Sequence, residues 1–306
     1  MRGFSGLTKR NVIVFLKDRQ SVVFSLLTSI IVLVLYLLFL KGTFVDAIET
    51  VLSQQSMLSG RISAGDIDMF ANLILVTGIL GSAMITVPFN CLTTIVRDRE
   101  NRVDYDILAT PVKRWQIVLS YYLAGAFSSI LLNGIILTVA LMVIRMQGNL
   151  YLSAADICQT YGIVALGSVS ATAVFMILVL FFKTSSASGA FFGILSAASG
   201  FVIGAYIPIS QFSEKVQTVC NIFPASQVTI LLRNKLLGGL LGHMDESIGG
   251  IDEGMFVSSI KEIFSFQAKI FSRNLEIREM VCYIAVVLMI SLVAMTVIYS
   301  KNYRKK

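Results

Sequence analysis

The chain has 306 residues, of which 56% are hydrophobic and 14% are charged, and its formal net charge is +7. An ordinary soluble domain carries about 25% charged residues, so this composition excludes one and indicates a membrane protein. The net positive charge does not indicate nucleic-acid binding, because the Lys and Arg residues gather at the ends of apolar stretches, where they determine membrane topology.

Six stretches of at least 21 residues contain no Asp, Glu, Lys, Arg or His. They are residues 20–40, 69–96, 115–144, 157–182, 184–213 and 280–300. A helix of about 20 apolar residues crosses the hydrocarbon core of a bilayer. The sequence therefore predicts an all-α polytopic membrane protein with six transmembrane helices. Carriers driven by protons or ions normally keep an ionisable side chain at membrane depth, so we expect another energy source.

Residues 1–19 precede the first predicted span and are expected to form an interfacial helix. Apolar side chains fall along one helical stripe, and basic side chains lie away from it. The stripe consists of Phe4, Leu7, Val14 and Phe15, and the basic residues are Lys9, Arg10 and Lys17. A disordered arm is the alternative.

The distribution of basic residues predicts the orientation. Placing both termini and the connections after the second and fourth spans on one face gives that face fifteen Lys and Arg residues, including Arg304, Lys305 and Lys306. The two short loops of the opposite face hold only Lys41, Arg61 and Arg145. Because basic loops stay in the cytoplasm, we expect a multi-pass protein of the cell membrane with both termini cytoplasmic.

The connection between the second and third spans, residues 97–115, interleaves acidic and basic side chains. It is long enough for a short helix lying along the membrane surface, and an ordinary solvated loop is the alternative. Thr110 and Pro111 suit the N-cap and first turn of a helix, so we expect them to begin the third span.

Residues 208–278 lie between the fifth and sixth spans. Within them the uncharged run 216–232 contains Pro224, and Pro208 closes the preceding span. A run this short that is broken by proline is expected to form two re-entrant half-helices rather than a seventh crossing. We expect a polar outer extension over residues 233–278, with an amphipathic helix at about 255–272.

Small residues recur at four-residue spacing in the fifth span, at Gly189 and Gly193 and again at Gly200 and Gly204. Such spacing lets helices approach closely, either within the chain or across a dimer contact. Three asparagines in the second and third spans are expected to form interhelical hydrogen bonds. They are Asn72, Asn90 and Asn133.

The sequence predicts no catalytic, metal or cofactor-binding residue. The single histidine, His243, lies in the expected outer extension, and no Gly-rich phosphate loop with its Lys occurs. The spacing of the four cysteines fits neither a metal site nor a dense disulfide framework, so we expect them to be small apolar residues of the packed interior. Cys158 and Cys220 are both expected near the outer face, so one disulfide between them is the alternative.

The order of these features resembles the permease subunits of type-two ATP-binding-cassette exporters. The shared features are the basic-Asp turn at 17–19, six spans, a charged loop after the second span, and a proline-broken pair in which Pro224 is followed by Arg233. The resemblance implies one permease domain over residues 1–306, paired with a second permease protomer of the same or another chain. ATP and Mg would bind to a separate ATPase subunit, and an apolar or amphipathic drug, peptide or lipid would be exported. The extension after Arg233 is longer than in minimal members.

The resemblance also implies that residues 97–115 hold the coupling helix that docks on the ATPase. The residues that would carry this role are Arg97, Asp98, Arg99, Glu100, Arg102, Asp104, Asp106 and Pro111. Two other function classes stay open at this point. One is a secondary carrier or channel, and the other is a non-transporting sensor or assembly protein that uses the outer region.

Overall fold

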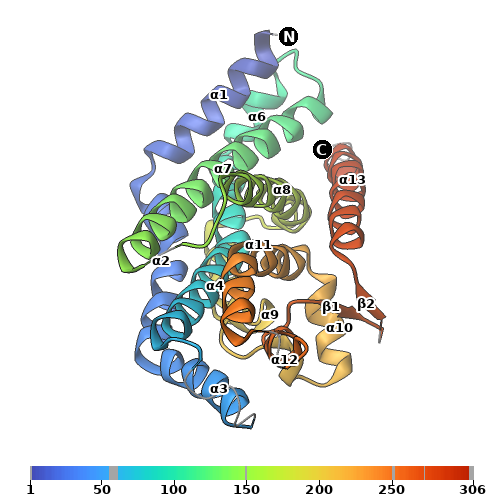
Figure 1. Ribbon diagram of the computed structural model, residues 1–306. Coiled ribbons are helices and arrows are strands. Elements are labelled where there is room, and N and C mark those ends of the chain that lie inside the picture. The colour runs from blue at the N-terminus through green and yellow to red at the C-terminus, as the bar shows by residue number, and fades with distance from the viewer. Residues whose placement is uncertain (1, 55–60, 149, 250–251, 272, 303–306) are drawn as a thin grey trace.

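The computed structural model describes residues 2–54, 61–148, 150–249, 252–271 and 273–302 (Figure 1). Arg304, Lys305 and Lys306, which contribute to the predicted charge bias, lie outside these residues. The elements in chain order are α1 (Arg2–Lys17), α2 (Arg19–Leu35), a π-helical segment (Tyr36–Leu40), α3 (Lys41–Gln54), α4 (Ala64–Cys91), α5 (Thr93–Glu100), α6 (Val103–Leu108), α7 (Arg114–Gln147), α8 (Ala154–Val179), α9 (Ser185–Val202), a 3₁₀ turn (Ile209–Gln211), α10 (Glu214–Ile222), α11 (Pro224–Ile248), α12 (Met255–Ile263), β1 (Ala268–Ile270), β2 (Arg273–Leu275) and α13 (Ile277–Asn302).

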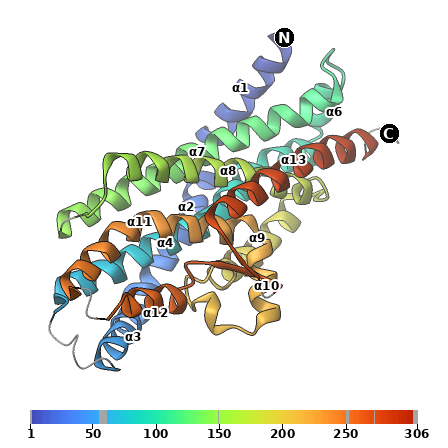
Figure 2. The same ribbon diagram turned by 45° about the vertical axis from the view of Figure 1, so that its right-hand side comes forward.

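Six helical segments in the described part of the chain are long and apolar enough to cross a membrane. They are Arg19–Leu52, Ala64–Glu100, Arg114–Gln147, Ala154–Val179, Ser185–Val202 and Ile277–Lys301. Each contains most of one predicted span, so the all-α six-span fold is confirmed. The start of α1, the short α6 and the end of α13 lie at one end of the molecule, and α3 and α12 lie at the other (Figures 1 and 2).

The first membrane-length helix is longer than the uncharged run that predicted it. A π-helical segment joins α2 to α3 without a break, so Lys41 lies inside one continuous helix. The Lys41 ammonium lies 2.9 Å from Asp68 Oδ1 near the start of α4, which compensates its charge. Phe44 of α3 packs edge-to-face on Phe264, with ring centroids 5.5 Å apart. The helix therefore continues as far as the end of the molecule at which α12 lies.

The N-terminal helix α1 packs along α7. Phe15 and Asn11 are buried, whereas Val14, which the periodicity places on the apolar stripe, is 37% exposed. Arg10 was expected to face away from the packing surface, but its side chain is half-buried and contacts Asp98. The helix itself is confirmed, and its place at a membrane interface stays a prediction.

α4 forms the centre of the fold and is buried along nearly its whole length, with α11 beside it (Figure 2). An added Cβ at Gly81, in the middle of α4, would lie 2.2 Å from the hydroxyl oxygen of Thr229. A Cβ at Gly167, in the middle of α8, would collide with the same turn of α11. At its other end α11 reaches the start of α4, where the Arg61 guanidinium donates to the Ile248 carbonyl at 3.3 Å. α11 therefore begins beside the middle of α4 and α8 and runs to the end of the molecule at which α3 and α12 lie.

The structure confirms the predicted break into two helices and corrects the extent of the second one, whereas re-entry of this pair into the membrane stays a prediction. α10 ends at Ile222 and α11 starts at Pro224, which occupies the first helical position, where a missing N–H costs nothing. α11 does not end near residue 232, because leucines continue at helical spacing and are buried against α4 and α8 as far as Ile248. Residues 233–248 of the predicted polar extension are therefore a helix with one buried face.

The predicted amphipathic helix at 255–272 is also shorter in the structure. α12 ends at Ile263, and a β-hairpin follows in which Ala268 pairs with Leu275. Ser265 adopts a positive φ of 55°, which ends the helical path. The cause is long-range, because the Phe264 and Ser265 carbonyls accept hydrogen bonds from Arg233 of α11.

The glycine pairs predicted in the fifth span separate into two kinds, and Gly204 lies beyond the end of α9 with a positive φ of 69°. Added Cβ atoms at Gly200 and Gly204 would collide with Tyr206 and Ile209, so these two glycines serve packing within the chain. Cβ atoms at Gly189 and Gly193 would meet nothing within 4 Å. A dimer contact at these two positions stays a prediction.

Two of the three asparagines make the predicted interhelical bonds. Asn72 donates to Gln147 at 3.0 Å, and Asn133 donates to Ser168 at 3.0 Å. Asn90 differs, because its side-chain nitrogen is buried without a partner among the described residues. Cys158 is exposed, Cys220 is buried, and both thiols are free, so the conceivable bridge is absent from the described structure.

Candidate functional site: a polar junction between α5 and α6

The predicted short helix between the second and third spans is present as α6. α4 bends at Leu92 into α5, and Arg102 then adopts a left-handed conformation (φ 63°) that starts α6. Ile107 and Asp104 are buried and fix α6 against the helical body. The four residues that end α5, Arg97 to Glu100, each contact a different part of the chain.

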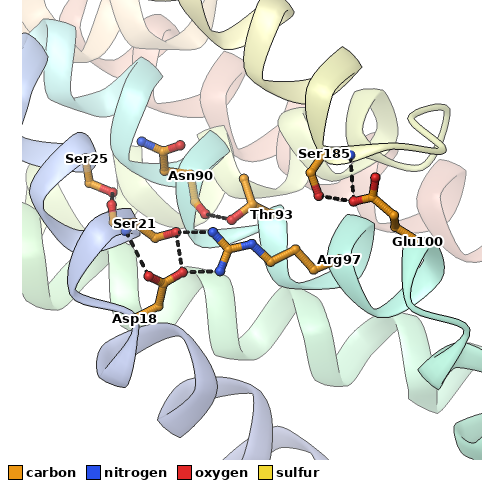
Figure 3. Close-up of polar contacts among 8 residues, drawn as sticks. All are labelled: Asp18, Ser21, Ser25, Asn90, Thr93, Arg97, Glu100 and Ser185. Atoms are coloured by element: carbon orange, nitrogen blue, oxygen red, sulfur yellow. Dashed lines mark hydrogen bonds and ion pairs between the residues drawn. The ribbon is translucent and has the colours of Figure 1, made fainter.

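Arg97 connects α5 to the start of α2 (Figure 3). Its guanidinium forms an ion pair with Asp18 and donates to the Ser21 hydroxyl at 3.1 Å. Asp18 also caps α2 by accepting from the Ser21 backbone N–H at 3.2 Å. Burial alone would raise the pKa of Asp18, but the hydrogen bonds from Ser21 and Arg97 outweigh it, so the pKa is lowered from 3.8. The carboxylate therefore stays ionised at neutral pH.

Asp98 connects α5 to α1 and α7. Its carboxylate, almost fully buried, accepts from both terminal nitrogens of Arg10, one at 2.8 Å, and from the Tyr121 hydroxyl. The hydrogen bond and charge of Asp98 raise the pKa of the Arg10 guanidinium further above its usual range. This bidentate arrangement is the strong form of an ion pair and fixes orientation as well as distance.

Arg99 and Glu100 connect α5 to the turn between α8 and α9. Arg99 donates to the Leu180 carbonyl at 2.9 Å and to the Phe182 carbonyl, at the end of α8. Glu100 accepts from the Ser185 backbone N–H at 3.0 Å and from the Ser185 hydroxyl, at the first residue of α9 (Figure 3). Cations suit the carbonyl end of a helix and anions the amide end, so both contacts have the favourable sign.

Four consecutive side chains thus bind α2, α1 with α7, the end of α8, and the start of α9. We call residues Arg97–Glu100 the junction. Through these contacts α5 is joined to five other helices at once.

The remaining candidates divide by exposure. Asp104 is buried, whereas Arg102, Asp106 and Pro111 are exposed, together with Tyr105 at 52%. We call the exposed residues Arg102, Tyr105, Asp106 and Pro111 the coupling face. Of the eight residues expected to meet an ATPase, the four of the junction contact other parts of the chain, although Glu100 is itself exposed, and Asp104 is buried. Only three lie on the coupling face.

Thr110 and Pro111 do not begin the third span, as their types suggested. The Thr110 hydroxyl donates to the Ile107 carbonyl at 2.6 Å and closes α6. α7 begins three residues later at Arg114, where the Gln116 side chain accepts from the Lys113 backbone N–H at 3.1 Å. The Thr-Pro pair therefore separates α6 from α7.

In the outer re-entrant segment, Arg233 is fully buried, while Pro208 and Pro224 shape the adjoining turns. The Arg233 guanidinium donates to four backbone carbonyls, and none of these bonds involves a carboxylate. The acceptors are Gly204 at 2.7 Å, Phe264 at 2.8 Å, Ser265 at 3.3 Å and Ile203 at 3.4 Å. Arg233 therefore joins α11 to the end of α9 and to the α12–hairpin connection, which is a structural role.

Sequence reasoning missed the intramolecular partners Arg10, Asp18 and Tyr121. Arg10 lies 88 positions from Asp98, and nothing local in the sequence pairs them. The sequence did contain one signal for the Arg97 contact. Asp18 is the one acidic residue among the basic residues before the first span, and its carboxylate is expected to pair with a cation.

Comparison with known families adds to this geometry. The family described as ABC-2 family transporter protein matches residues 48–300, which is more than half of the chain. The chain belongs to this family. The comparison with curated proteins returned no match.

The match to the ABC-2 family includes the junction, the coupling face and the re-entrant pair, and it begins within α3. α1 and α2, which supply Arg10 and Asp18, precede the matched segment. An ABC-2 family protein is the membrane component of a transporter and is not itself the catalytic subunit. Among the described residues no group of three or more His, Cys, Asp or Glu side chains is placed to hold a metal ion.

Proposed function

We propose that this chain is the permease subunit of an exporter in the cell membrane, working as a dimer with ATPase subunits on separate chains. The observation that supports the proposal most directly is the junction. Its four consecutive side chains bind five helices besides their own, next to a short helix whose coupling face is exposed. The uncharged runs within the spans favour an apolar or amphipathic substrate, such as a drug, peptide or lipid.

The mechanism follows from the connections of the junction. Nucleotide-driven closure of the ATPases would displace α6, and the junction would pass this displacement to α1, α2 and α7 and to the turn between α8 and α9. The permease would then alternate between two packings whose populations depend on bound nucleotide. Hydrolysis would take place on the partner chain, which would hold ATP and Mg.

Charge reversal on the coupling face tests this function. We expect the Arg102→Glu, Asp106→Lys double variant to insert and fold normally but to co-purify with little ATPase and to lose substrate-stimulated ATP hydrolysis. Exposed ion pairs contribute only about 0.2–1 kcal/mol each, so neutral single variants should have small effects. Charge reversal adds repulsion between α6 and the ATPase surface. It also disturbs the alignment of the two proteins, which complementary charges determine. The measurements are ATPase co-purification and ATP hydrolysis.

Lys261→Glu, Glu262→Lys is the matched control, because it reverses two exposed charges on α12 at the opposite end of the molecule. Glu100 and Asp104 are unsuitable for this test. Glu100 binds the start of α9, and Asp104 is buried, so reversal of either would disturb the fold. Unchanged co-purification and hydrolysis in the Arg102, Asp106 variant would show that docking occurs elsewhere.

The proposed orientation gives a labelling prediction. In a variant whose four cysteines are replaced by serine, a single cysteine at Ser258 of α12 should react with a membrane-impermeant maleimide in intact cells. A cysteine at Tyr105 of α6 should react only after lysis. Both positions are exposed in part or in full, so accessibility does not separate them. Reaction at Tyr105 in intact cells would overturn the cytoplasmic placement of the coupling face.

A further inference from the structure

A cavity of 340 Å³ lies beside the junction, between α2, the α4–α5 bend and α9. Pockets that hold small ligands begin at about 300 Å³. The lining combines polar side chains from α2, α4, α5 and α9 with apolar walls. The lining residues are Gln20, Ser21, Phe24, Asn90, Thr93, Val96, Arg97, Ser185, Ser188, Gly189 and Phe192.

Two side chains of this lining have unused hydrogen-bonding capacity. Asn90 is 6% exposed and Ser188 is 2% exposed. The Asn90 amide nitrogen and the Ser188 hydroxyl have no hydrogen-bond partner among the described residues. In Figure 3 the only bond drawn at Asn90 goes to its backbone carbonyl, from Thr93. A buried polar group without a partner costs about 1–3 kcal/mol, which a ligand that pairs with it would recover.

The charge of the cavity limits what it can bind. Arg97 is the one charged residue in the described lining, and its guanidinium is already neutralised by Asp18. A ligand with a net charge would have to bury it without a free counter-charge, which is unfavourable in a half-apolar site. The unused groups are an amide and a hydroxyl, which suit ester carbonyls and hydroxyls.

The walls add an apolar component. Phe24 and Phe192 face the cavity from α2 and α9, and Phe24 is 44% exposed on the outer surface of α2. Gly189 lines the cavity as well, and a Cβ there would meet nothing within 4 Å. We propose that this cavity binds the uncharged, hydrogen-bonding head of an amphiphile whose tail passes out beside Phe24. Binding of this ligand does not require that the chain be an exporter.

The test uses a monoacylglycerol that carries a diazirine near the head end of its acyl chain. With the purified full chain in lipid nanodiscs, we expect labelling of the α2 and α9 peptides that contain Phe24 and Phe192. Excess unlabelled monoacylglycerol should abolish it. A phosphatidic acid with the same diazirine tail should label these peptides at least about tenfold less at equal concentration, because its charge has no free partner.

Two variants separate the cavity from its surroundings. Gly189→Leu should fill the cavity and weaken saturable labelling about tenfold, whereas Gly193→Leu, one turn further on α9 and outside the lining, should leave labelling unchanged. Asn90→Leu should weaken labelling without lowering thermal stability, because it removes a buried amide nitrogen that has no partner.

Labelling that does not saturate, or equal labelling in Gly189→Leu and the unmodified chain, would overturn the proposal. Equal losses in Gly189→Leu and Gly193→Leu would show that this face of α9 meets another protein chain and would overturn it too. Stronger labelling by the phosphatidic acid would overturn the assignment of an uncharged head. None of these measurements depends on ATPase coupling. Failure of the cavity proposal can therefore be distinguished from failure of the export proposal.

Discussion

Replacing Arg233 by methionine is expected to lower the free energy of unfolding by about 3 kcal/mol, the largest loss we expect from one substitution in the outer region. Methionine has a similar length and fits an apolar site, but it leaves carbonyls that now accept from the guanidinium without that donor. The affected carbonyls belong to the turn after α9 and to the end of α12. We expect the α12–hairpin connection to loosen first, because Arg233 joins it to α11.

The measurement is the thermal transition of the purified chain in detergent, followed by limited proteolysis of residues 252–271. Lys235→Met is the matched control, because Lys235 lies two residues away on the same helix and is only partly buried. Arg233→Lys should be intermediate, since an ammonium offers three donors without the planar fork that reaches carbonyls on two sides. Equal stability of the Arg233→Met chain and the unmodified chain would contradict a structural role for Arg233.

The Arg10–Asp98 pair should respond asymmetrically to the removal of either partner. Arg10→Met leaves the buried Asp98 carboxylate with the Tyr121 hydroxyl as its remaining side-chain hydrogen-bond donor in the described structure, and we expect a loss of about 3 kcal/mol. Asp98→Asn leaves Arg10, whose side chain is 34% exposed and can turn toward water, so we expect a loss of about 1 kcal/mol. Thermal unfolding of both variants measures the difference.

Two further variants complete this experiment. The Arg10→Met, Asp98→Asn double variant should be more stable than Arg10→Met alone, because no uncompensated buried charge remains. Lys9→Met is the control, since Lys9 is exposed and adjacent to Arg10. If Arg10→Met were no less stable than Lys9→Met, the pair would not hold α1 against the junction.

Segment type and span number could be predicted from the sequence because they depend on local composition. An uncharged run long enough to cross the bilayer must satisfy its backbone hydrogen bonds internally, so it must be helical whatever surrounds it. The sequence also correctly predicted a break at Pro224, because proline suits the first position of a helix, but it did not predict that the helix continues to Ile248. The family also follows from sequence, both from the order of motifs and from the match over residues 48–300.

The helix boundaries that were predicted wrongly are those that depend on residues far away in the chain. Lys41 lies within a continuous helix whose Phe44 packs on Phe264, and α12 ends at Ile263 where Arg233 binds the following carbonyls. Thr110 carries the correct chemistry for a cap, but its hydroxyl bonds backward to Ile107 and closes the preceding helix. The local preference of Thr110 allowed it either to close the preceding helix or to begin the next one, and the packing of α6 selected the first.

The candidate site shows the same division. Sequence alone selected residues 97–115 by their charge and their position between two spans. It did not show that Asp98 is directed inward to Arg10 while Asp106 remains exposed, because interleaved charges look alike in a sequence. Side-chain direction depends on the rotation of α5 and α6 against α1, α2 and α9, which only the packed structure determines. The sequence by itself thus determined the spans and the family, and tertiary packing decided which charges connect helices and which remain available to a partner.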